Sequence, residues 1–258
     1  MPYFSYENKR IYYEEYGKGT PVIFCHGNTA SSRMFSLLMP LYEDDLHCIL
    51  IDFLGCGRSD RTASFPSDIW IDEARQVVSL VQHLELEQVA LLGTSGGVWV
   101  ALNAAMMMKG SVSSLIADSF DGCILNSSFS SNLIKERECA MKDEDAKGFY
   151  EWCLGTDWQE IVQKDTKALL ACADSRDSLY VSPLSAIECP VLLTGSAEDL
   201  MCRSDMEEEY MEMKEMMGNA SIHMFKHGGH PAILSNAEEF AEISKDFIKR
   251  HVPLQMMP

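Results

Sequence analysis

The hydrophobic residues of this chain follow two patterns, short apolar runs and longer stretches with helical spacing. Apolar runs bounded by turn residues are typical of strands buried on both faces of a sheet, and they occupy residues 22–25, 47–53, 89–92, 115–117, 191–193 and 222–225. A Tyr-rich run at 9–16 predicts a further strand in a hairpin arm. Helical spacing follows at residues 31–41, 68–84, 98–108, 205–217 and 237–251. This alternation predicts an α/β fold with a mostly parallel central sheet and helices on both faces.

The alternation lapses between residues 122 and 184, where helical patterns continue without an apolar strand. Helices are expected there at about 132–141, 143–154 and 158–173. We interpret residues 122–184 as a helical cap inserted into a core formed by residues 1–121 and 185–258. A chain of 258 residues suits one α/β domain with an insertion better than two independent domains.

The chain is strongly acidic, with 39 acidic and 21 basic residues and a formal net charge of −18. Nucleic acids and anionic membranes are bound by clustered Lys and Arg, so this balance disfavours both as partners. Residues 1–10 lack the apolar segment of a signal peptide, and no later run approaches the roughly 18 apolar residues that span a bilayer. We therefore expect a soluble cytoplasmic protein that acts on a small molecule.

The nine cysteines show no Cys-x-x-Cys spacing, and many lie inside apolar runs. This distribution is typical of reduced, buried thiols and not of a disulfide framework or a zinc site. The sequence therefore predicts neither a metal site nor a cofactor.

The stretch Gly93-Thr94-Ser95-Gly96-Gly97 follows an apolar run and places a serine between glycines. A serine nucleophile on a sharp strand-to-helix turn needs neighbours without side-chain bulk, because its backbone is strained and the next helix packs closely. Ser95 is therefore the candidate nucleophile. Its hydroxyl needs a histidine base, and that imidazole needs an acid that holds its tautomer.

An acid and a histidine follow later strands of the predicted sheet. Asp199 comes just after the strand at 191–193, and His230 comes after the strand at 222–225, on a Gly-Gly turn. Because functional groups of open α/β sheets gather at the carboxyl ends of strands, we expect Ser95, Asp199 and His230 to lie together. Other candidates remain, and they are Glu198, Asp118 and Asp121 for the acid and His227 for the base.

Backbone N–H groups should stabilise the negative charge that forms on a substrate carbonyl oxygen. One donor is expected to be the amide of Gly96, directly after the nucleophile. The other is assigned to the amide of Asn28, in the loop after an early strand, with Thr29 as the alternative. We expect His26 to support this loop through hydrogen bonds and Arg58 to brace the loop region.

Five motifs in one order resemble the α/β-hydrolase fold family. They are His26-Gly27-Asn28, the turn at 52–59, the elbow at 93–97, Asp199 and Gly228-Gly229-His230-Pro231. The resemblance implies the α/β-hydrolase fold with a helical cap after the sixth strand, and acyl transfer by a Ser-His-Asp triad. Haloalkane dehalogenases and epoxide hydrolases of this fold use an aspartate nucleophile at the elbow, so a serine there disfavours those activities.

The segment 152–158, followed by 184–193, is also similar to valacyclovir hydrolase-like esterases of small substrates. An amino-acid ester hydrolase of that kind carries an acidic residue beside the serine, where this chain has Gly96. We expect a hydrolase of small or medium carboxylic esters, with an apolar wall formed by cap and core aromatics, namely Phe120, Phe129, Trp152 and Trp158. The alternatives are an aminopeptidase or amidase that holds a substrate ammonium on Glu136 or Glu138, and a slow-turnover ligand sensor.

Overall fold

The computed structural model describes residues 2–175 and 178–251 and contains an eight-stranded sheet in the order β1-β2-β4-β3-β5-β6-β7-β8. The strands are β1 (Tyr3–Tyr6), β2 (Lys9–Tyr16), β3 (Thr20–Cys25), β4 (Leu46–Asp52), β5 (Val89–Thr94), β6 (Val112–Asp118), β7 (Val191–Ser196) and β8 (Ala220–Phe225). Strand β2 pairs antiparallel with β1 and β4, and all other pairs are parallel. The mostly parallel sheet is thus confirmed.

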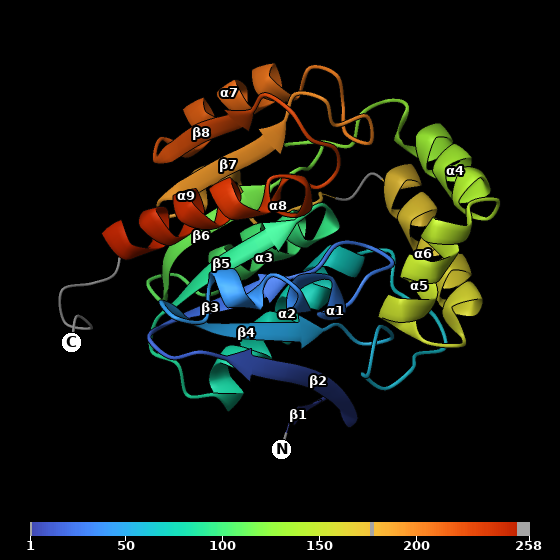
Figure 1. Cartoon of the computed structure of the whole chain (residues 1–258), viewed down its shortest axis with the longest axis horizontal. Coiled ribbons are helices and arrows are strands. Elements are labelled where there is room, and N and C mark those ends of the chain that lie inside the picture. Colours follow the sequence, from blue (N-terminus) through green and yellow to red (C-terminus); the bar gives the residue numbers. More distant parts are fainter. Residues whose placement is uncertain (1, 176–177, 252–258) are drawn as a thin grey trace.

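Helices cover both faces of the sheet (Figure 1). One apolar cluster contains Ile23 and Cys25 of β3 together with residues of α2 (Ile69–His83), α3 (Gly96–Met107) and α7 (Met206–Met217). The other cluster contains the alternate residues Val22 and Phe24 together with residues of α1 (Arg33–Ser36), α8 (Ala232–Ser235) and α9 (Ala237–Arg250). Both faces of a central strand are therefore buried, which explains why its sequence is continuously apolar.

Three helices lie between β6 and β7, where the sequence predicts an insertion. They are α4 (Phe129–Ala140), α5 (Glu144–Leu154) and α6 (Trp158–Asp174), and the short 3₁₀ helix η2 (Leu184–Ala186) precedes β7. The arrowheads of the parallel strands point toward α4–α6, so these helices lie beside the carboxyl edge of the sheet (Figure 1). Residues 176–177 of the predicted cap and 252–258 of the predicted core lie outside the described residues.

Three local elements differ from the sequence prediction. The single helix expected over 31–41 is α1 followed by a separate 3₁₀ helix, η1 (Met39–Leu41). Pro40 lies in the first turn of η1, and proline has no N–H with which to continue the helix that precedes it. Strand β1 and the four-residue helix α8 are additional, and both are too short to produce a readable period.

Candidate active site

Ser95 occupies the turn between β5 and α3 with φ 53° and ψ −128°, a conformation that is strained for any residue with a side chain. Its backbone N–H donates to the carbonyl oxygen of Asp118 over 2.8 Å, which fixes the turn. A Cβ at Gly93 or Gly97 would overlap with backbone carbonyl groups, those of Gly97 and Cys25 respectively. The glycines predicted to flank the serine are therefore required by the close approach of strand and helix.

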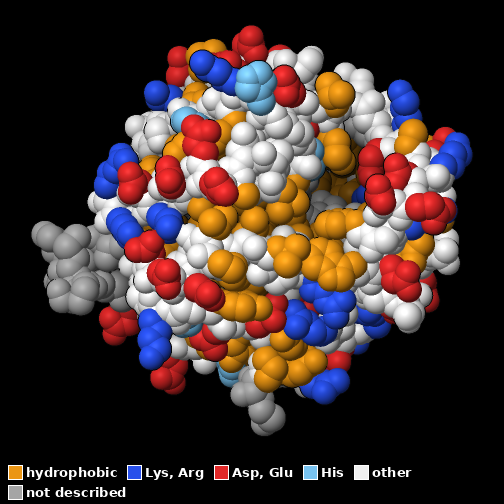
Figure 2. Space-filling view, viewed as in Figure 1, with side chains coloured by type: hydrophobic (Ala, Val, Ile, Leu, Met, Phe, Trp, Pro, Cys, Tyr) orange, Lys and Arg blue, Asp and Glu red, His pale blue; other side chains and the backbone are white. Residues whose placement is uncertain are grey.

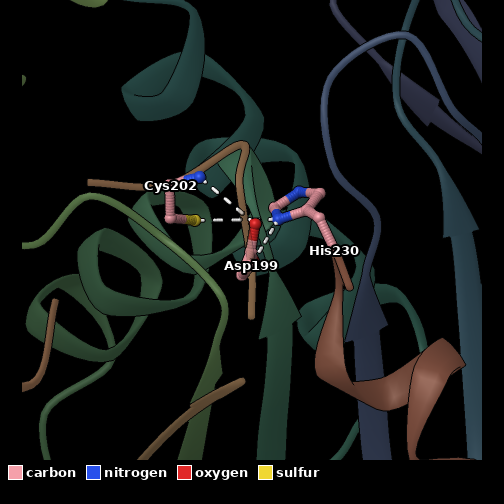
Figure 3. Close-up of side chains that lie close together, drawn as sticks. All are labelled: Asp199, Cys202 and His230. Carbon is pink, nitrogen blue, oxygen red and sulfur yellow. Dashed lines mark hydrogen bonds and ion pairs between the residues drawn. The ribbon is translucent and has the colours of Figure 1, made fainter. Parts of the chain in front are cut away.

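Asp199 and His230 come together at the same edge of the sheet (Figure 3). The imidazole Nδ1 of His230 donates to Asp199 Oδ2 over 2.8 Å. Because a carboxylate only accepts, this bond places the proton of the neutral ring on Nδ1 and leaves Nε2 as an acceptor. The side chain of Asp199 is fully buried, and that of His230 is 12% exposed.

The carboxylate of Asp199 is held in its charged form. Burial alone would raise its pKa, but the hydrogen bond and charge of His230 and the backbone N–H groups of Met201 and Cys202 outweigh burial and lower the pKa. Those N–H groups donate to Asp199 Oδ1 over 2.9 and 3.2 Å. Asp199 is thus an oriented anion beside the imidazole.

The alternative base and its acidic neighbour pair with each other at the surface. His227 Nδ1 lies 3.0 Å from Glu198 Oε1, and the two side chains are 82% and 59% exposed. The two acids are sequence neighbours and the two histidines are three residues apart, yet only the Asp199–His230 pair is largely buried. Within residues 2–175 and 178–251, no hydrogen bond joins Ser95 Oγ to His230.

The alternative acids have other partners. Asp118 accepts hydrogen bonds from the hydroxyl groups of Thr94, Ser119 and Thr194 over 2.9–3.0 Å, and burial raises its pKa to about 6 despite them. It therefore ties the ends of β5, β6 and β7 together. Asp121 accepts from the side chain of Asn126 and the backbone of Arg203.

The loop after β3 is fixed by its own side chains. His26 Nδ1 donates to the carbonyl oxygen of Gly27 over 2.8 Å, and Nε2 accepts the N–H of Phe53 over 3.2 Å. Burial lowers the pKa of His26, so it stays neutral in this role. His26 thus forms one hydrogen bond within this loop and one to the backbone after β4, in agreement with the supporting role expected from the sequence.

Asn28 joins this loop to two helices. Its Oδ1 accepts from Trp70 Nε1 of α2 over 3.1 Å, and its Nδ2 donates to Asp165 Oδ2 of α6 over 3.0 Å. A Cβ at Gly96 would overlap with Asn28 Oδ1, so no side chain fits at position 96 without moving Asn28. This crowding explains the glycine directly after Ser95.

Asp165 forms a buried ion pair with Arg137 of α4. Arg137 also donates to the hydroxyl groups of Tyr150 and Thr29 over 2.8 and 3.3 Å. Burial raises the pKa of Asp165, and the charge of Arg137 opposes that rise. The network connects α4, α5 and α6 to the loop that carries Asn28.

Arg58 braces the neighbouring loop. Its guanidinium donates to Tyr12 Oη over 2.7 Å and to Glu14 Oε1 over 2.9 Å, and its backbone N–H donates to Asp52 Oδ2 over 2.7 Å. These bonds agree with the bracing role expected from the sequence.

Two of the predicted wall aromatics lie near the sheet. Phe120 is buried after β6, where its ring lies 5.5 Å from that of Trp99 and 5.4 Å from that of Tyr210. Phe129 begins α4 and packs, partly buried, against the same apolar cluster. Both belong to the side of the sheet that α2, α3 and α7 cover.

The other two, Trp152 and Trp158, belong to α5 and α6. Trp158 is buried with its ring 5.5 Å from that of Tyr150, and Trp152 is 37% exposed, with its carbonyl oxygen accepting from Arg33. The structure therefore brings these two into the α5–α6 region and not beside Phe120. Figure 2 shows a hollow between this region and the core, with hydrophobic side chains around it.

Sequence reasoning missed Trp70, Arg137, Asp165 and Cys202. Asp165 and Arg137 are polar residues on helix faces that are otherwise buried, a pattern that signals pairing across an interface. Cys202 lies three residues beyond Asp199, and its Sγ is 3.6 Å from His230 Nδ1. Nothing in the linear sequence places it against a histidine 28 residues later.

Known proteins with similar sequences include hydrolases of several kinds. Proline iminopeptidase of Lactobacillus crispatus (strain ST1) is 24% identical over 97% of both chains. Haloalkane dehalogenase 2 of Mycobacterium tuberculosis (strain ATCC 25618 / H37Rv) is 30% identical, but the match covers 40% of this chain and 36% of the dehalogenase. This chain thus spans about a third of that relative's length.

Solved structures share the fold. An esterase from Exiguobacterium antarcticum superposes with a TM-score of 0.75 at 22% identity, over 93% of this chain and 96% of the esterase. Among the helices in the described part of the chain, none has the length and hydropathy to span a membrane. The model of the alpha/beta hydrolase family matches residues 22–243, and this chain belongs to that family.

Proposed function

We propose that this hydrolase cleaves small or medium carboxylic esters through an acyl-enzyme formed on Ser95. The observation that carries the proposal is the 2.8 Å hydrogen bond between His230 Nδ1 and Asp199 at the edge where Ser95 ends β5. This bond leaves Nε2 of His230 free to accept a proton, and the carboxylate of Asp199 then balances the positive charge of the imidazolium. Catalytic hydrogen bonds to the nucleophile are often long before substrate binds, so the open Ser95–His230 gap is compatible with this role.

In the proposed reaction, His230 Nε2 takes the hydroxyl proton of Ser95 as Oγ attacks the ester carbonyl carbon. The resulting oxyanion is bound by the amides of Gly96 and Asn28. The imidazolium then gives its proton to the leaving alcohol, and the C–O ester bond breaks. Water adds to the acyl-enzyme by the same route and releases the acid. These steps need no redox partner.

We assign α4–α6 to a cap over the site, and the hollow beside it supports an apolar acyl or alcohol group (Figure 2). Phe120 of the core and Phe129 at the start of α4, which belong to one apolar cluster, are proposed to form one side of the wall. Trp152 and Trp158 remain proposed wall residues on the cap side. An active site enclosed in this way favours substrates small enough to fit between cap and sheet.

The similarity to a proline iminopeptidase over 97% of both chains favours one alternative, hydrolysis of an aminoacyl amide. That reaction needs a carboxylate that is free to bind the substrate ammonium. Glu136 is already paired with Arg137 over 2.9 Å, and the Tyr150 hydroxyl donates to it. The other candidate carboxylate, Glu138, is exposed on α4. Because the less exposed of the two is already engaged, we rank the ester reaction first, and parallel assays of p-nitrophenyl esters and prolyl p-nitroanilide discriminate between the two.

The decisive test compares wild type with Ser95→Ala. Fluorophosphonate labelling should disappear, and turnover of p-nitrophenyl acetate and butyrate should fall by several orders of magnitude. Labelling that persists in Ser95→Ala contradicts the assignment. A wild-type protein that gives a first-turnover burst without steady turnover supports the ligand-sensor alternative.

Two matched variants test whether His230 or His227 is the catalytic base. His230→Gln should lose about 10³-fold or more in kcat, since it removes the base. His227→Gln removes the exposed imidazole of the neighbouring pair and should retain activity. The opposite ranking contradicts the proposed triad.

A further inference from the structure

Two members of the proposed triad, Asp199 and His230, meet the thiol of Cys202 at one point (Figure 3). Asp199, Cys202 and His230 each direct a donor atom there, and these atoms all lie within 4.8 Å of one another. No metal site is predicted from the sequence, because the nine cysteines show no Cys-x-x-Cys spacing and many lie in apolar runs.

The spacing suits a tetrahedral zinc ion. Zinc lies about 2.3 Å from a thiolate and about 2.0–2.1 Å from an imidazole nitrogen, which separates the two donors by about 3.6 Å at the tetrahedral angle. Cys202 Sγ and His230 Nδ1 are 3.6 Å apart. A zinc ion bound to both would hold the imidazole nitrogen and the carboxylate oxygen about 3.4 Å apart. His230 Nδ1 and Asp199 Oδ2 are 2.8 Å apart, so they need to separate by only about 0.6 Å once the proton between them leaves.

The charges also match. A thiolate and a carboxylate supply two negative charges, which a divalent cation neutralises in this largely buried place. Thiolate with imidazole is a donor set that selects zinc over magnesium or calcium. The net charge of −18 raises the concentration of cations near the surface. The 12% exposed ring of His230 gives the ion access, and water supplies the fourth ligand.

The geometry points to a second property of this site: Asp199, Cys202 and His230 bind a divalent zinc-type ion that switches the hydrolase off. The ion takes the Nδ1 lone pair of His230, so the ring proton moves to Nε2. The Cys202 thiol loses its proton to solvent as the S–metal bond forms. With Nε2 protonated, the ring cannot accept the proton of Ser95. This inhibition rests on the proposed function, whereas the binding does not.

Binding is measured directly on the complete chain with CoCl₂ as a spectroscopic probe. A Co²⁺–thiolate bond gives an intense near-ultraviolet charge-transfer band, which ZnCl₂ should bleach by displacement. We expect the band in wild type and its loss in Cys202→Ala and Cys202→Ser. Two variants are used so that a folding failure of one, seen by circular dichroism, leaves the other informative.

Two control variants separate this site from adventitious binding. Cys139→Ala removes an exposed thiol, and His227→Gln removes an exposed imidazole that faces a carboxylate without a thiol. Both should keep the cobalt band. A band that survives in both Cys202 variants, or disappears in Cys139→Ala, overturns the proposed site.

Inhibition is then measured as the ratio of ester turnover with and without ZnCl₂ for each variant, with reversal by EDTA. The Cys202 variants should require at least tenfold more zinc than wild type for half inhibition. If cobalt binding gives the expected band but no metal-free protein turns over esters, the proposed function is refuted and the metal site stands. Full turnover that zinc inhibits equally in wild type and Cys202→Ala refutes the metal switch alone.

Discussion

Removing the carboxylate of Asp165 should destabilise the protein and impair the proposed oxyanion loop together. Its side chain is 5% exposed, and that of its partner Arg137 is 13% exposed. Asp165 Oδ1 accepts from Arg137 over 3.0 Å, and Oδ2 accepts from Asn28 over 3.0 Å. Asp165→Ala therefore leaves a buried guanidinium without its main counter-charge and a side-chain amide without its acceptor.

The magnitude follows from these contacts. Breaking a buried ion pair by removing one partner costs about 3–5 kcal/mol. Arg137 keeps its contacts with Glu136 and with the hydroxyl of Tyr150, which favours the lower end of that range. A loss of about 3 kcal/mol lowers the Tm of a domain of this size by about 6–12 °C. Without Asp165, the side chain of Asn28 loses one hydrogen bond, and its backbone N–H, the proposed oxyanion donor, is expected to shift. Because removing one oxyanion donor lowers kcat by about 10²–10³-fold, a partial shift should lower kcat by at least about tenfold.

A double-mutant cycle tests the reasoning. Urea unfolding and ester kinetics are measured for Asp165→Leu, Arg137→Met and the double variant. Replacing both partners by apolar residues should recover much of the loss, with a coupling energy of about 2 kcal/mol. If the two single losses add within about 0.5 kcal/mol, the pair does not interact as described. A normal kcat in a destabilised Asp165→Ala would disconnect the ion pair from the oxyanion loop.

Three further predictions concern single positions. Gly96→Ala should lower kcat/KM by about 100-fold, because its Cβ displaces Asn28; unchanged kinetics would rule out that crowding. Gly148→Ala in α5, with nothing within 4 Å of its Cβ, is the matched control and should gain about 0.5–1 kcal/mol of stability by urea unfolding. Folding raises the pKa of Asp118 from 3.8 to about 6, so the native state holds this proton more tightly and stability falls as pH rises through that window. The free energy of unfolding should fall by about 1.4 kcal/mol between about pH 5 and 7.5. Urea unfolding at these pH values should show this fall in wild type and not in Asp118→Asn.

Much of the fold is readable from the sequence because strands buried on both faces must be continuously apolar. The run at β3 and the runs at β5 and β7 are buried along their length, so each forms an unbroken signal. The four residues of β1 have no such signal. The helix expected over 31–41 fails at Pro40, whose missing N–H ends one helical segment and begins another.

The candidate site is predictable where chemistry follows a strand end directly. Ser95 is recognised from the glycines that its strained turn requires, and Asp199 and His230 follow β7 and β8. The contacts that join distant segments are not readable in this way. Asp165 lies 137 residues from Asn28, and no local pattern indicates which buried polar group it meets. The arrangement of the four proposed wall aromatics is not readable either, since the ring that Trp158 contacts, Tyr150, is decided by how α5 packs on α6.

The two hydrogen bonds of the Asn28 side chain have a consequence for substrate traffic. Because one reaches Trp70 of α2 and the other Asp165 of α6, α6 cannot swing outward as a rigid lid without releasing or dragging the loop after β3. Substrates should then enter through an opening that is present without any movement of α6. For small esters, kcat is accordingly expected not to change with solvent viscosity, and kcat/KM should change only as far as diffusion of the substrate limits it. The upper size limit for substrates would be set by the width of that aperture and not by the work of opening it.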